Sequence, residues 1–327
     1  MPLAYASCSG KATRMMPSRL TLTVPADFEL FKAVCSYGHF KLAPTHWDRD
    51  AQQLHRVLRD QNKRNVRTRI TQNGNGKPVA IHCDRSLSRD DQQHIKAQVI
   101  RMLRIDEDMS RWYKLHKSAK RRGFGRLFRG ADLFEDLVKT ITSCNVTWPN
   151  TMNMNRLLVE HVGHGGFPTP EQVADFGEQR LKDRCKVGYR AGRIAQLGRD
   201  VADGLLDLDW FEQPERTSDE VYAALLKLHG IGPYGAANVC MLLGYYDRLA
   251  IDTETYRHYC KVHHVKRPKD PSKLHKRIEK HYGQFAPYPF LAYWFELWQG
   301  YEKRFGPSKM GHSTQDASPS TGAAMND

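Results

Sequence analysis

The chain has 327 residues, which is long enough for one large domain or two modest domains with real cores. Its 50 lysines and arginines exceed its 36 aspartates and glutamates, so the formal net charge is +14. This surplus favours a polyanionic partner, with nucleic acid first and a membrane surface second. The sequence has no run of eighteen apolar residues, so we expect no transmembrane helix and no membrane partner.

The cysteines are odd in number and widely spaced. They are Cys8, Cys35, Cys83, Cys144, Cys185, Cys240 and Cys260, and no two of them form a C-x-x-C pair. This pattern predicts reduced thiols in an intracellular compartment and no structural zinc. We expect neither a metal nor an organic cofactor.

The two ends of the chain lack the patterns of folded structure. Residues 1–20 contain Lys11, Arg14 and Arg19 among small and hydroxyl side chains, and the first acidic residue is Asp27. Such a segment is typical of a disordered start or of an organellar transit peptide. Residues 308–327 lack apolar periodicity and are predicted to form a disordered tail. We expect a nuclear protein, with an organelle (mitochondrion or plastid) as the alternative.

Residues 21–110 are predicted to form a small α+β domain. Two short β-like stretches, Thr21–Val24 and Lys77–His82, accompany a turn rich in asparagine and glycine at 73–76. A helix is predicted from Ser88 to Leu103, because Ser88 can cap the first turn and apolar side chains recur at helical spacing on one face. No motif in this domain indicates a chemistry.

Residues 111–307 are predicted to form a mainly helical domain, with glycines and prolines between its segments. The 3.6-residue pattern is clearest in Leu133–Ile141 and Val221–Leu228. At the start of this domain, the strip Arg111–Gly130 carries eight basic residues, four aromatic residues and no acidic residue. The strip is either a solvated linker face or a surface that follows DNA phosphates. Its candidate DNA contacts are Lys120, Arg121 and Arg122.

A glycine hairpin separates two helical segments in the second half of the chain. One apolar helix ends near Leu228, and Gly230 and Gly232 then allow backbone angles that other residues resist. Pro233 suits the first position of a new helix. The free N–H groups of the hairpin and of the new helix form an anion site, because the positive end of the helix dipole lies behind them. The alternative is an ordinary corner between two helices.

An acidic residue, Asp252, lies twenty positions after Gly232. It follows the apolar run Leu249–Ile251 directly and precedes another helical stretch. An isolated aspartate at such a place is an ordinary helix N-cap.

The hairpin has the form L-x-G-I-G-P-x-x-A-x-x-V over residues 228–239. It resembles the helix-hairpin-helix motif of the HhH-GPD DNA glycosylase superfamily, which includes 3-methyladenine and 8-oxoguanine DNA glycosylases. The resemblance implies a mainly α fold, in which a helical HhH-GPD core follows the small N-terminal α+β domain. It also implies a base excision repair enzyme that acts on double-stranded DNA, flips out a damaged base and hydrolyses its N-glycosidic bond. We expect a monomer.

The same resemblance assigns roles to the candidate site residues. Asp252 corresponds to the catalytic carboxylate, which stabilises the oxocarbenium character of the deoxyribose and can orient or deprotonate water. Asn145 lies where 8-oxoguanine glycosylases have an asparagine that contacts the orphaned partner base. The predicted hairpin contacts to DNA are Leu228, Gly230, Ile231, Gly232 and Tyr234. The predicted base-pocket residues are Tyr234, Asn238 and Tyr293.

Two positions depart from common patterns of the superfamily. Bifunctional members have a nucleophilic lysine two residues after the second hairpin glycine, where this chain has Tyr234, which cannot form a Schiff base. The chain therefore resembles the monofunctional 3-methyladenine DNA glycosylases, without lyase activity. Many members have histidine two residues after the aspartate, but this chain has Glu254, which keeps open the alternative of a non-catalytic helix-hairpin-helix DNA-binding module. Only Cys260 lies beyond Asp252, so we expect the four-cysteine iron–sulfur loop of some members to be absent.

The signals for the substrate point in two directions. Tyr234 favours alkylated bases, whereas Gly188–Ala191 resembles the G-Y-R-A segment of 8-oxoguanine glycosylases. Phe167–Pro170 matches the F-P-T/S-P turn of the superfamily. Aromatic residues near the C-terminus could stack on an electron-poor alkylated purine, and of these we expect Phe295 and Trp298 to lie in the core instead.

Overall fold

A computed structural model describes residues 16–305. Most of the predicted N-terminal segment 1–20 and all of the predicted tail 308–327 therefore lie outside the described residues. No helix between residues 16 and 305 is long and apolar enough to cross a membrane. The cysteines in that range, from Cys35 to Cys260, are all free thiols.

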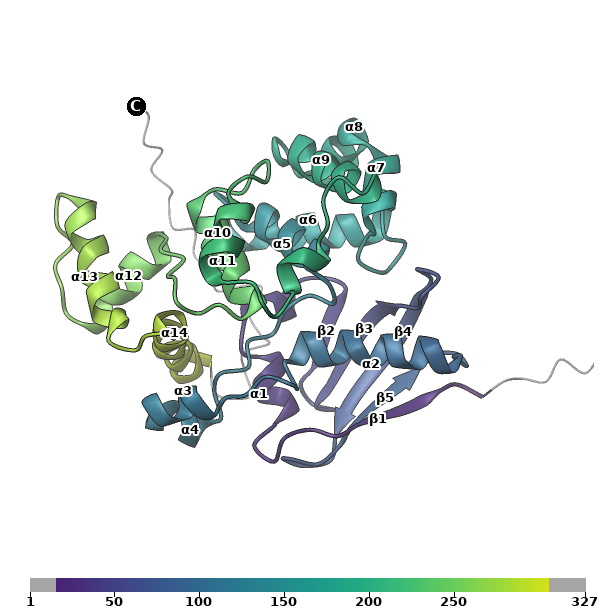
Figure 1. Ribbon diagram of the computed structural model, residues 1–327, viewed down its shortest axis with the longest axis horizontal. Helices are drawn as coiled ribbons and strands as arrows, with labels where there is room; N and C mark the ends of the chain where they lie inside the picture. The colour runs from purple at the N-terminus through teal and green to yellow at the C-terminus, as the bar shows by residue number, and fades with distance from the viewer. Residues whose placement is uncertain (1–15, 306–327) are drawn as a thin grey trace, which may run out of the picture.

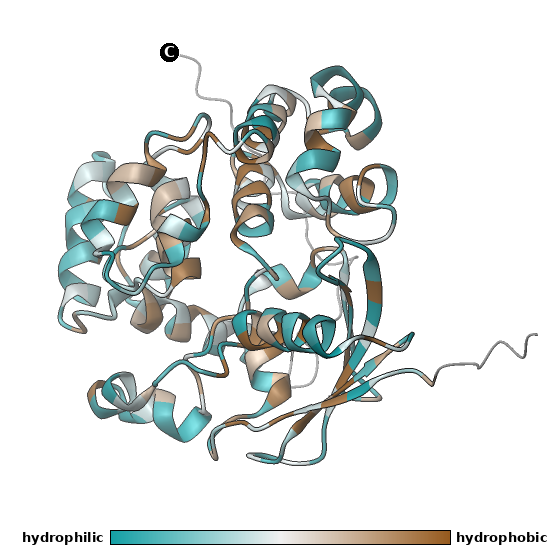
Figure 2. Ribbon diagram, turned by 45° about the vertical axis from the view of Figure 1, so that its right-hand side comes forward, coloured by the Kyte–Doolittle hydropathy of each residue, from teal (hydrophilic) through white to brown (hydrophobic). Residues whose placement is uncertain are grey.

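Five strands form one antiparallel sheet with the order β1-β5-β4-β3-β2. Their bounds are β1 Arg19–Leu22, β2 Thr45–Asp48, β3 Gln53–Arg59, β4 Asn65–Gln72 and β5 Val79–Cys83. Side chains along β3 and β4 alternate between buried and more exposed positions. In Figure 2 the strands of the sheet carry both brown, hydrophobic stretches and teal, hydrophilic ones. The sequence predicted β1 two residues too late, because Leu20 and not only Leu22 faces the core. It missed β2, β3 and β4, in which polar and charged residues alternate with the apolar ones.

A helix packs across the sheet as the sequence predicts. This is α2 (Arg89–Leu103), which follows the short α1 (Leu30–Val34) and the 3₁₀ turn η1 (Gly38–Lys41). The Oγ atom of Ser88 accepts a 3.1 Å hydrogen bond from the backbone N–H of Asp91, so the predicted cap is confirmed. The apolar face that the sequence predicts is fully buried in the cluster that includes the sheet, and α2 lies across the sheet in Figure 1.

The rest of the described chain is helical, so a mainly helical fold with a small antiparallel sheet is confirmed (Figure 1). The helices are α3 Ser110–Leu115, α4 Lys117–Arg122, α5 Leu133–Ser143, α6 Trp148–His161, α7 Pro170–Phe176, α8 Glu178–Cys185, α9 Arg190–Ala202, α10 Ser218–Leu225, α11 Pro233–Leu243, α12 Thr253–Val262, α13 Pro271–Gly283 and α14 Pro289–Phe305, with a 3₁₀ turn η2 at Asp209–Glu212. The predicted helix 221–228 begins and ends three residues earlier, because a capping box at Thr217 starts it and Leu226 ends it.

Two hydrophobic clusters organise these elements. One cluster joins the sheet and α2–α4 to α12–α14, and the other joins α5–α11. The boundary predicted near residue 110 falls within the first cluster, which continues through Trp112 and Phe124 to the C-terminal helices. Phe295 and Trp298 of α14 pack their rings 5.1 Å from Phe124, so their predicted place in the core is confirmed. The chain thus returns to its N-terminal domain through α12–α14.

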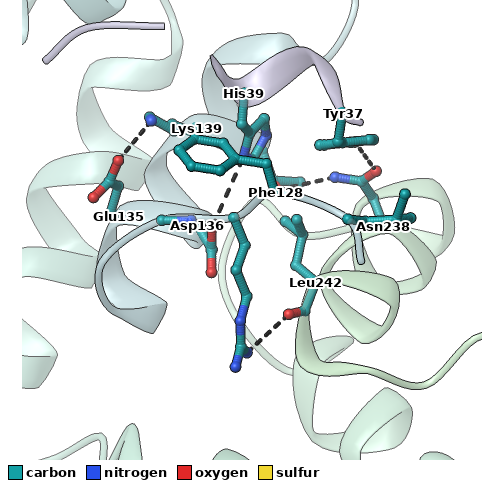
Figure 3. A network of polar contacts seen from close by, with 12 residues as sticks. Tyr37, His39, Phe128, Glu135, Asp136, Lys139, Asn238 and Leu242 are labelled. Carbon is teal, nitrogen blue, oxygen red and sulfur yellow. Dashed lines mark hydrogen bonds and ion pairs between the residues drawn. The ribbon is translucent and has the colours of Figure 1, made fainter. Parts of the chain in front are cut away.

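Buried charges attach α5 to the N-terminal domain (Figure 3). Glu135 pairs with Lys139 one turn along the helix, with an N–O distance of 2.5 Å, and Asp136 lies 3.7 Å from His39. The arginine partners of the two carboxylates are Arg56 for Glu135 and Arg101 for Asp136. Because removing buried carboxylates from water is costly, they require all of these partners. The network fixes α5, and with it the loop that follows α5, relative to the sheet.

Candidate active site

The predicted hairpin connects α10 to α11. Gly230 has a positive φ of 90°, and a Cβ atom there would lie 2.3 Å from Cδ of Arg193, so only glycine fits. Ile231 is buried against the α5–α11 cluster and anchors the turn, while its backbone N–H bonds to the carbonyl of Leu228 at 3.0 Å. Gly232 is the N-cap of α11 and has no atom within 4 Å of the place where a Cβ would be. The hairpin is therefore packed against the protein at Gly230 and Ile231 and has free space beside Gly232.

The start of α11 leaves backbone donors available. Pro233 occupies the first turn, and no side chain caps the helix. The unbonded N–H groups of this turn, such as that of Tyr234, carry the partial positive charge of the helix dipole. An open helix N-terminus of this kind binds a phosphate group without any cationic side chain.

Asp252 is the N-cap of α12. Its Oδ1 atom accepts hydrogen bonds from the backbone N–H of Thr255 at 2.8 Å and from the Thr255 hydroxyl at 2.9 Å. The Thr255 hydroxyl also accepts a 3.2 Å bond from the backbone N–H of Asp252, which completes a capping box. Among residues 16–305, no donor bonds to the second carboxylate oxygen, Oδ2. The capping role therefore holds the carboxylate in place through one oxygen and leaves the other available.

Glu254, at the position where the resemblance to the superfamily led us to expect histidine, does not join this group. Its carboxylate forms a two-bond ion pair with Arg257 at the surface, including a 2.7 Å bond from the Arg257 Nε. The Glu254 side chain, in the first turn of α12, is thus paired with Arg257.

Two tyrosines from separate parts of the fold lie within electrostatic reach of the carboxylate. Burial raises the pKa of the Tyr37 hydroxyl, and the nearby Tyr234 hydroxyl and the Asp252 carboxylate raise it further. Burial and Asp252 likewise raise the pKa of Tyr234. Both tyrosines therefore stay neutral and protonated beside Asp252. Tyr37 belongs to the N-terminal domain and was missed by sequence reasoning, because it lies in a segment without a motif.

Tyr37 and Asn238 bond to each other across the domain interface (Figure 3). The Tyr37 hydroxyl donates a 2.7 Å bond to Asn238 Oδ1, and Asn238 Nδ2 donates a 3.2 Å bond to the Thr140 hydroxyl. The predicted pocket residue Asn238 is therefore buried with its amide already bonded to protein. The ring of Trp294 lies 4.9 Å from that of Tyr37, and its Nε1 donates to the carbonyl of Ser36 at 2.7 Å.

Tyr293 reaches Asp252 through Thr255. The Tyr293 and Thr255 hydroxyl oxygens are 3.1 Å apart, and Thr255 bonds to Asp252. Tyr293 is only 4% exposed, so it supports the carboxylate from beneath. Tyr234, in contrast, borders an open cleft of about 370 Å³ between α11 and α13 that Ile251 also lines. Contact between Tyr293 and a bound base is a prediction from the sequence.

The loop after α5 presents Asn145 at the surface. Asn145 has a positive φ of 51°, and the buried guanidinium of Arg190 holds the loop by donating to the Asn145 carbonyl at 3.2 Å and to that of Cys144. The neighbouring Tyr189 is 56% exposed. The guanidinium carbons of Arg190 and Arg193 lie 4.4 Å and 4.9 Å from its ring. Arg193 also packs on Gly230, so this loop, Tyr189 and the hairpin form one neighbourhood.

The basic strip 111–130 is not one continuous surface. Lys120 and Arg121 of α4 are exposed, but Arg122 pairs with Glu302. Further along, Arg126 is buried and forms a 3.0 Å ion pair with Asp27, and Arg129 donates to the carbonyl of Leu242 at 2.9 Å. The interpretation of the whole strip as a phosphate-tracking surface is wrong for Arg126 and Arg129, because both guanidiniums are used inside the fold.

Comparison with known sequences finds one short similarity. No family model matches the sequence. A segment of 75 residues is 32% identical to YfjP of Bacillus subtilis, whose name assigns it provisionally as a DNA-3-methyladenine glycosylase. The match covers 23% of this chain and 25% of the relative, so it spans a quarter of the length of the curated protein.

Solved structures are similar over most of the chain. The 3-methyladenine DNA glycosylase from Archaeoglobus fulgidus aligns with a TM-score of 0.65 and 17% identity, covering 87% of this chain and 99% of that one. MBOgg1, solved with a low-affinity DNA ligand, aligns with a TM-score of 0.62 and 19% identity, covering 88% and 100%. The apo 8-oxoguanine glycosylase/lyase of Clostridium acetobutylicum aligns with a TM-score of 0.58 and 18% identity, covering 86% and 98%. The chain therefore has the fold that 3-methyladenine and 8-oxoguanine DNA glycosylases share, as the resemblance in its sequence indicates.

Proposed function

We propose that this protein is a DNA N-glycosylase that hydrolyses the N-glycosidic bond of a damaged base in double-stranded DNA. The observation that carries the proposal is how the two carboxylate oxygens of Asp252 are bonded. Its Oδ1 is fixed by Thr255, while its Oδ2 has no donor among the described residues, and Tyr234 of the hairpin helix lies within its electrostatic reach. A fixed carboxylate with one available oxygen suits the stabilisation of an oxocarbenium ion and the activation of water.

The surface next to this carboxylate suits DNA. The open N-terminus of α11 supplies backbone donors for a phosphate, and Gly232 leaves space for its approach. Tyr189 is 56% exposed and lies beside the guanidinium groups of Arg190 and Arg193, so it adds an aromatic ring and positive charge to this surface. A base must leave the helical stack to reach Asp252.

The residues around Asp252 support hydrolysis without lyase activity. The hairpin position that would hold a nucleophilic lysine is Tyr234, whose hydroxyl stays neutral. Lys139 is fully buried and paired with Glu135, and Lys227 on the hairpin is exposed to solvent. The buried, paired amine of Lys139 is therefore not available to a deoxyribose that faces Asp252.

The aromatic side chains support an alkylated purine ahead of an oxidised one. Tyr37, Tyr234 and Trp294 lie on the same side of the fold as Asp252, and Tyr37 and Trp294 present neighbouring rings. The faces of such rings attract a cation, and alkylation at a ring nitrogen gives a purine positive charge. The fold is shared by enzymes of both branches, so this preference rests on the side chains alone.

The product of the reaction tests the proposal. Duplexes that each contain one alkylated or oxidised base are incubated with the purified protein, and the strand is analysed with and without alkali. We expect an abasic site in an intact strand that breaks only after alkali, first with an alkylated purine, and no adduct after borohydride treatment. Release of no base from any lesion would contradict the glycosylase proposal. Strong borohydride trapping would show that an amine is the nucleophile and contradict the monofunctional assignment.

A further inference from the structure

Three metal-ligating side chains meet at one end of α12. His263 follows α12, His281 lies on α13 and Glu296 lies on α14. One ring nitrogen of each histidine and one carboxylate oxygen of Glu296 lie within 4.8 Å of one another. The centroids of the two histidine rings are 4.4 Å apart. Each side chain is partly buried, so the group is partly shielded from solvent and an ion can still reach it.

The Oε1 atom of Glu296, which faces His263, also has two further partners. His258 Nε2 lies 2.9 Å and the Tyr282 hydroxyl 2.8 Å from Glu296 Oε1. These contacts set the direction of the carboxylate, as outer partners orient the ligands in metal sites. His281, in contrast, makes ring contacts with its neighbours, but its ring nitrogens have no hydrogen-bond partner within residues 16–305. Its nitrogens are free to turn toward a ligand.

We propose that His263, His281 and Glu296 bind one divalent transition-metal ion, zinc in the first place, with water as the fourth ligand. Two nitrogens and one carboxylate oxygen are a donor set that zinc accepts. Ligand atoms about 2.0–2.1 Å from a tetrahedral zinc ion lie about 3.3 Å from one another. His263 Nε2 and Glu296 Oε1 are already 3.2 Å apart. Only His281 has to approach, by at most about 1.5 Å.

The metal would be structural. Asp252 and His263 lie at opposite ends of α12, and eleven residues at 1.5 Å each separate them by roughly 16 Å along the helix. An ion at His263 therefore cannot touch a sugar that faces Asp252. It would instead join the C-terminal ends of α12 and α13 to the middle of α14; α12 begins after Asp252, and α14 carries Tyr293. Because the ion binds the folded chain, it would stabilise that chain against unfolding.

The cysteine spacing, which predicts no structural zinc, gives no information about this site, because the site contains no cysteine. Its ligands are separated by 18 and 15 positions in the sequence, which is outside the spacing of short zinc motifs. The one signal in the sequence is local enrichment, since five of the 15 histidines lie between His258 and His281.

Titration of the untagged full-length protein with zinc, after removal of metal by a chelator, tests this proposal. We expect one ion per chain, a higher melting temperature with zinc, and the visible absorption of tetrahedral Co²⁺ when cobalt replaces zinc. His281→Ala and Glu296→Gln should each weaken zinc binding at least about tenfold. The matched control is His264→Asn, which changes an exposed neighbour at a left-handed position that asparagine tolerates, and which should bind zinc as the parent does.

Two results would overturn the proposal. One is the absence of stoichiometric binding of zinc or cobalt to the parent protein. The other is binding that both His281→Ala and Glu296→Gln leave unchanged, which would place the ion on the cysteines or elsewhere. Since the parent titration needs no variant, the proposal can be contradicted even if a substitution prevents folding.

Discussion

The hydroxyl of Tyr37 donates a 2.7 Å hydrogen bond to Asn238 Oδ1, although 201 positions separate the two residues in the sequence. The same amide donates to Thr140 on α5. One buried side chain thus connects the N-terminal domain, α5 and the hairpin helix α11 behind the proposed active site. The contact explains how a domain without a motif contributes to the position of the carboxylate.

Tyr37→Phe should destabilise the fold. The substitution keeps the ring beside Trp294 but leaves the buried Asn238 Oδ1 without its donor, which costs about 1–3 kcal/mol. Urea unfolding followed by tryptophan fluorescence measures the change. The control is Tyr222→Phe, because the Tyr222 hydroxyl has no hydrogen-bond partner among the described residues. Equal stability of the two variants would show that the Tyr37 bond contributes nothing.

The exposed part of the basic strip should contribute to DNA affinity. Log affinity for DNA falls linearly with log salt concentration. Changing Lys120 and Arg121 to glutamate should make this slope shallower by about 0.9 for each DNA phosphate that these side chains neutralise in the parent protein. Arg122, Arg126 and Arg129 are left unchanged, because they pair with or bond to other parts of the chain.

The control for this measurement places the same charge change elsewhere. Lys182 and Arg184 are exposed on α8, which lies far from α4 in Figure 1. Their reversal should change the slope less than reversal on α4. Equal slopes for the two double variants would show that net charge matters and that α4 does not contact DNA.

Stability should fall in acid through Glu135. Burial alone would raise its pKa, but Arg56 and Lys139 outweigh burial and lower the pKa to about 2 from 4.5. Because the folded-state pKa is lower, the ion pairs stabilise the fold fully above pH 4.5, and this stability is lost as the pH falls toward 2.

Glu135→Gln should therefore be less stable by about 3–5 kcal/mol at neutral pH, since it leaves buried cations unpaired, and should lose less stability on acidification than the parent. Urea unfolding at several pH values measures both effects. In the parent protein, carboxyl NMR gives the pKa of Glu135 directly. A value near 4.5 would contradict the account of the network.

Local patterns in the sequence predicted the parts of the site that lie within one segment. The hairpin residues Gly230 and Gly232, the start of α11 at Pro233 and the N-cap position of Asp252 all follow from neighbouring residues, and the structure places each as expected. The burial of Phe295 and Trp298 was also predicted correctly.

The parts that were missed depend on contacts between distant segments. The role of Tyr37 depends on Asn238, and the burial of Arg126 depends on Asp27, 99 positions away. Charge counted along the sequence cannot show which arginines find an internal partner. The histidines near Glu296 form a group only after α12, α13 and α14 pack together.

The rate of base release by Asp252→Asn tests the central claim most directly. Asparagine is as good an N-cap as aspartate, so the start of α12 and the melting temperature should be kept, but the negative charge is lost. We predict that the single-turnover rate of base release falls by about a hundredfold or more, while binding to lesion DNA is retained. A rate comparable to that of the parent protein would contradict the assignment of Asp252. It would leave a helix-hairpin-helix module that binds DNA through its hairpin, with any chemistry located elsewhere.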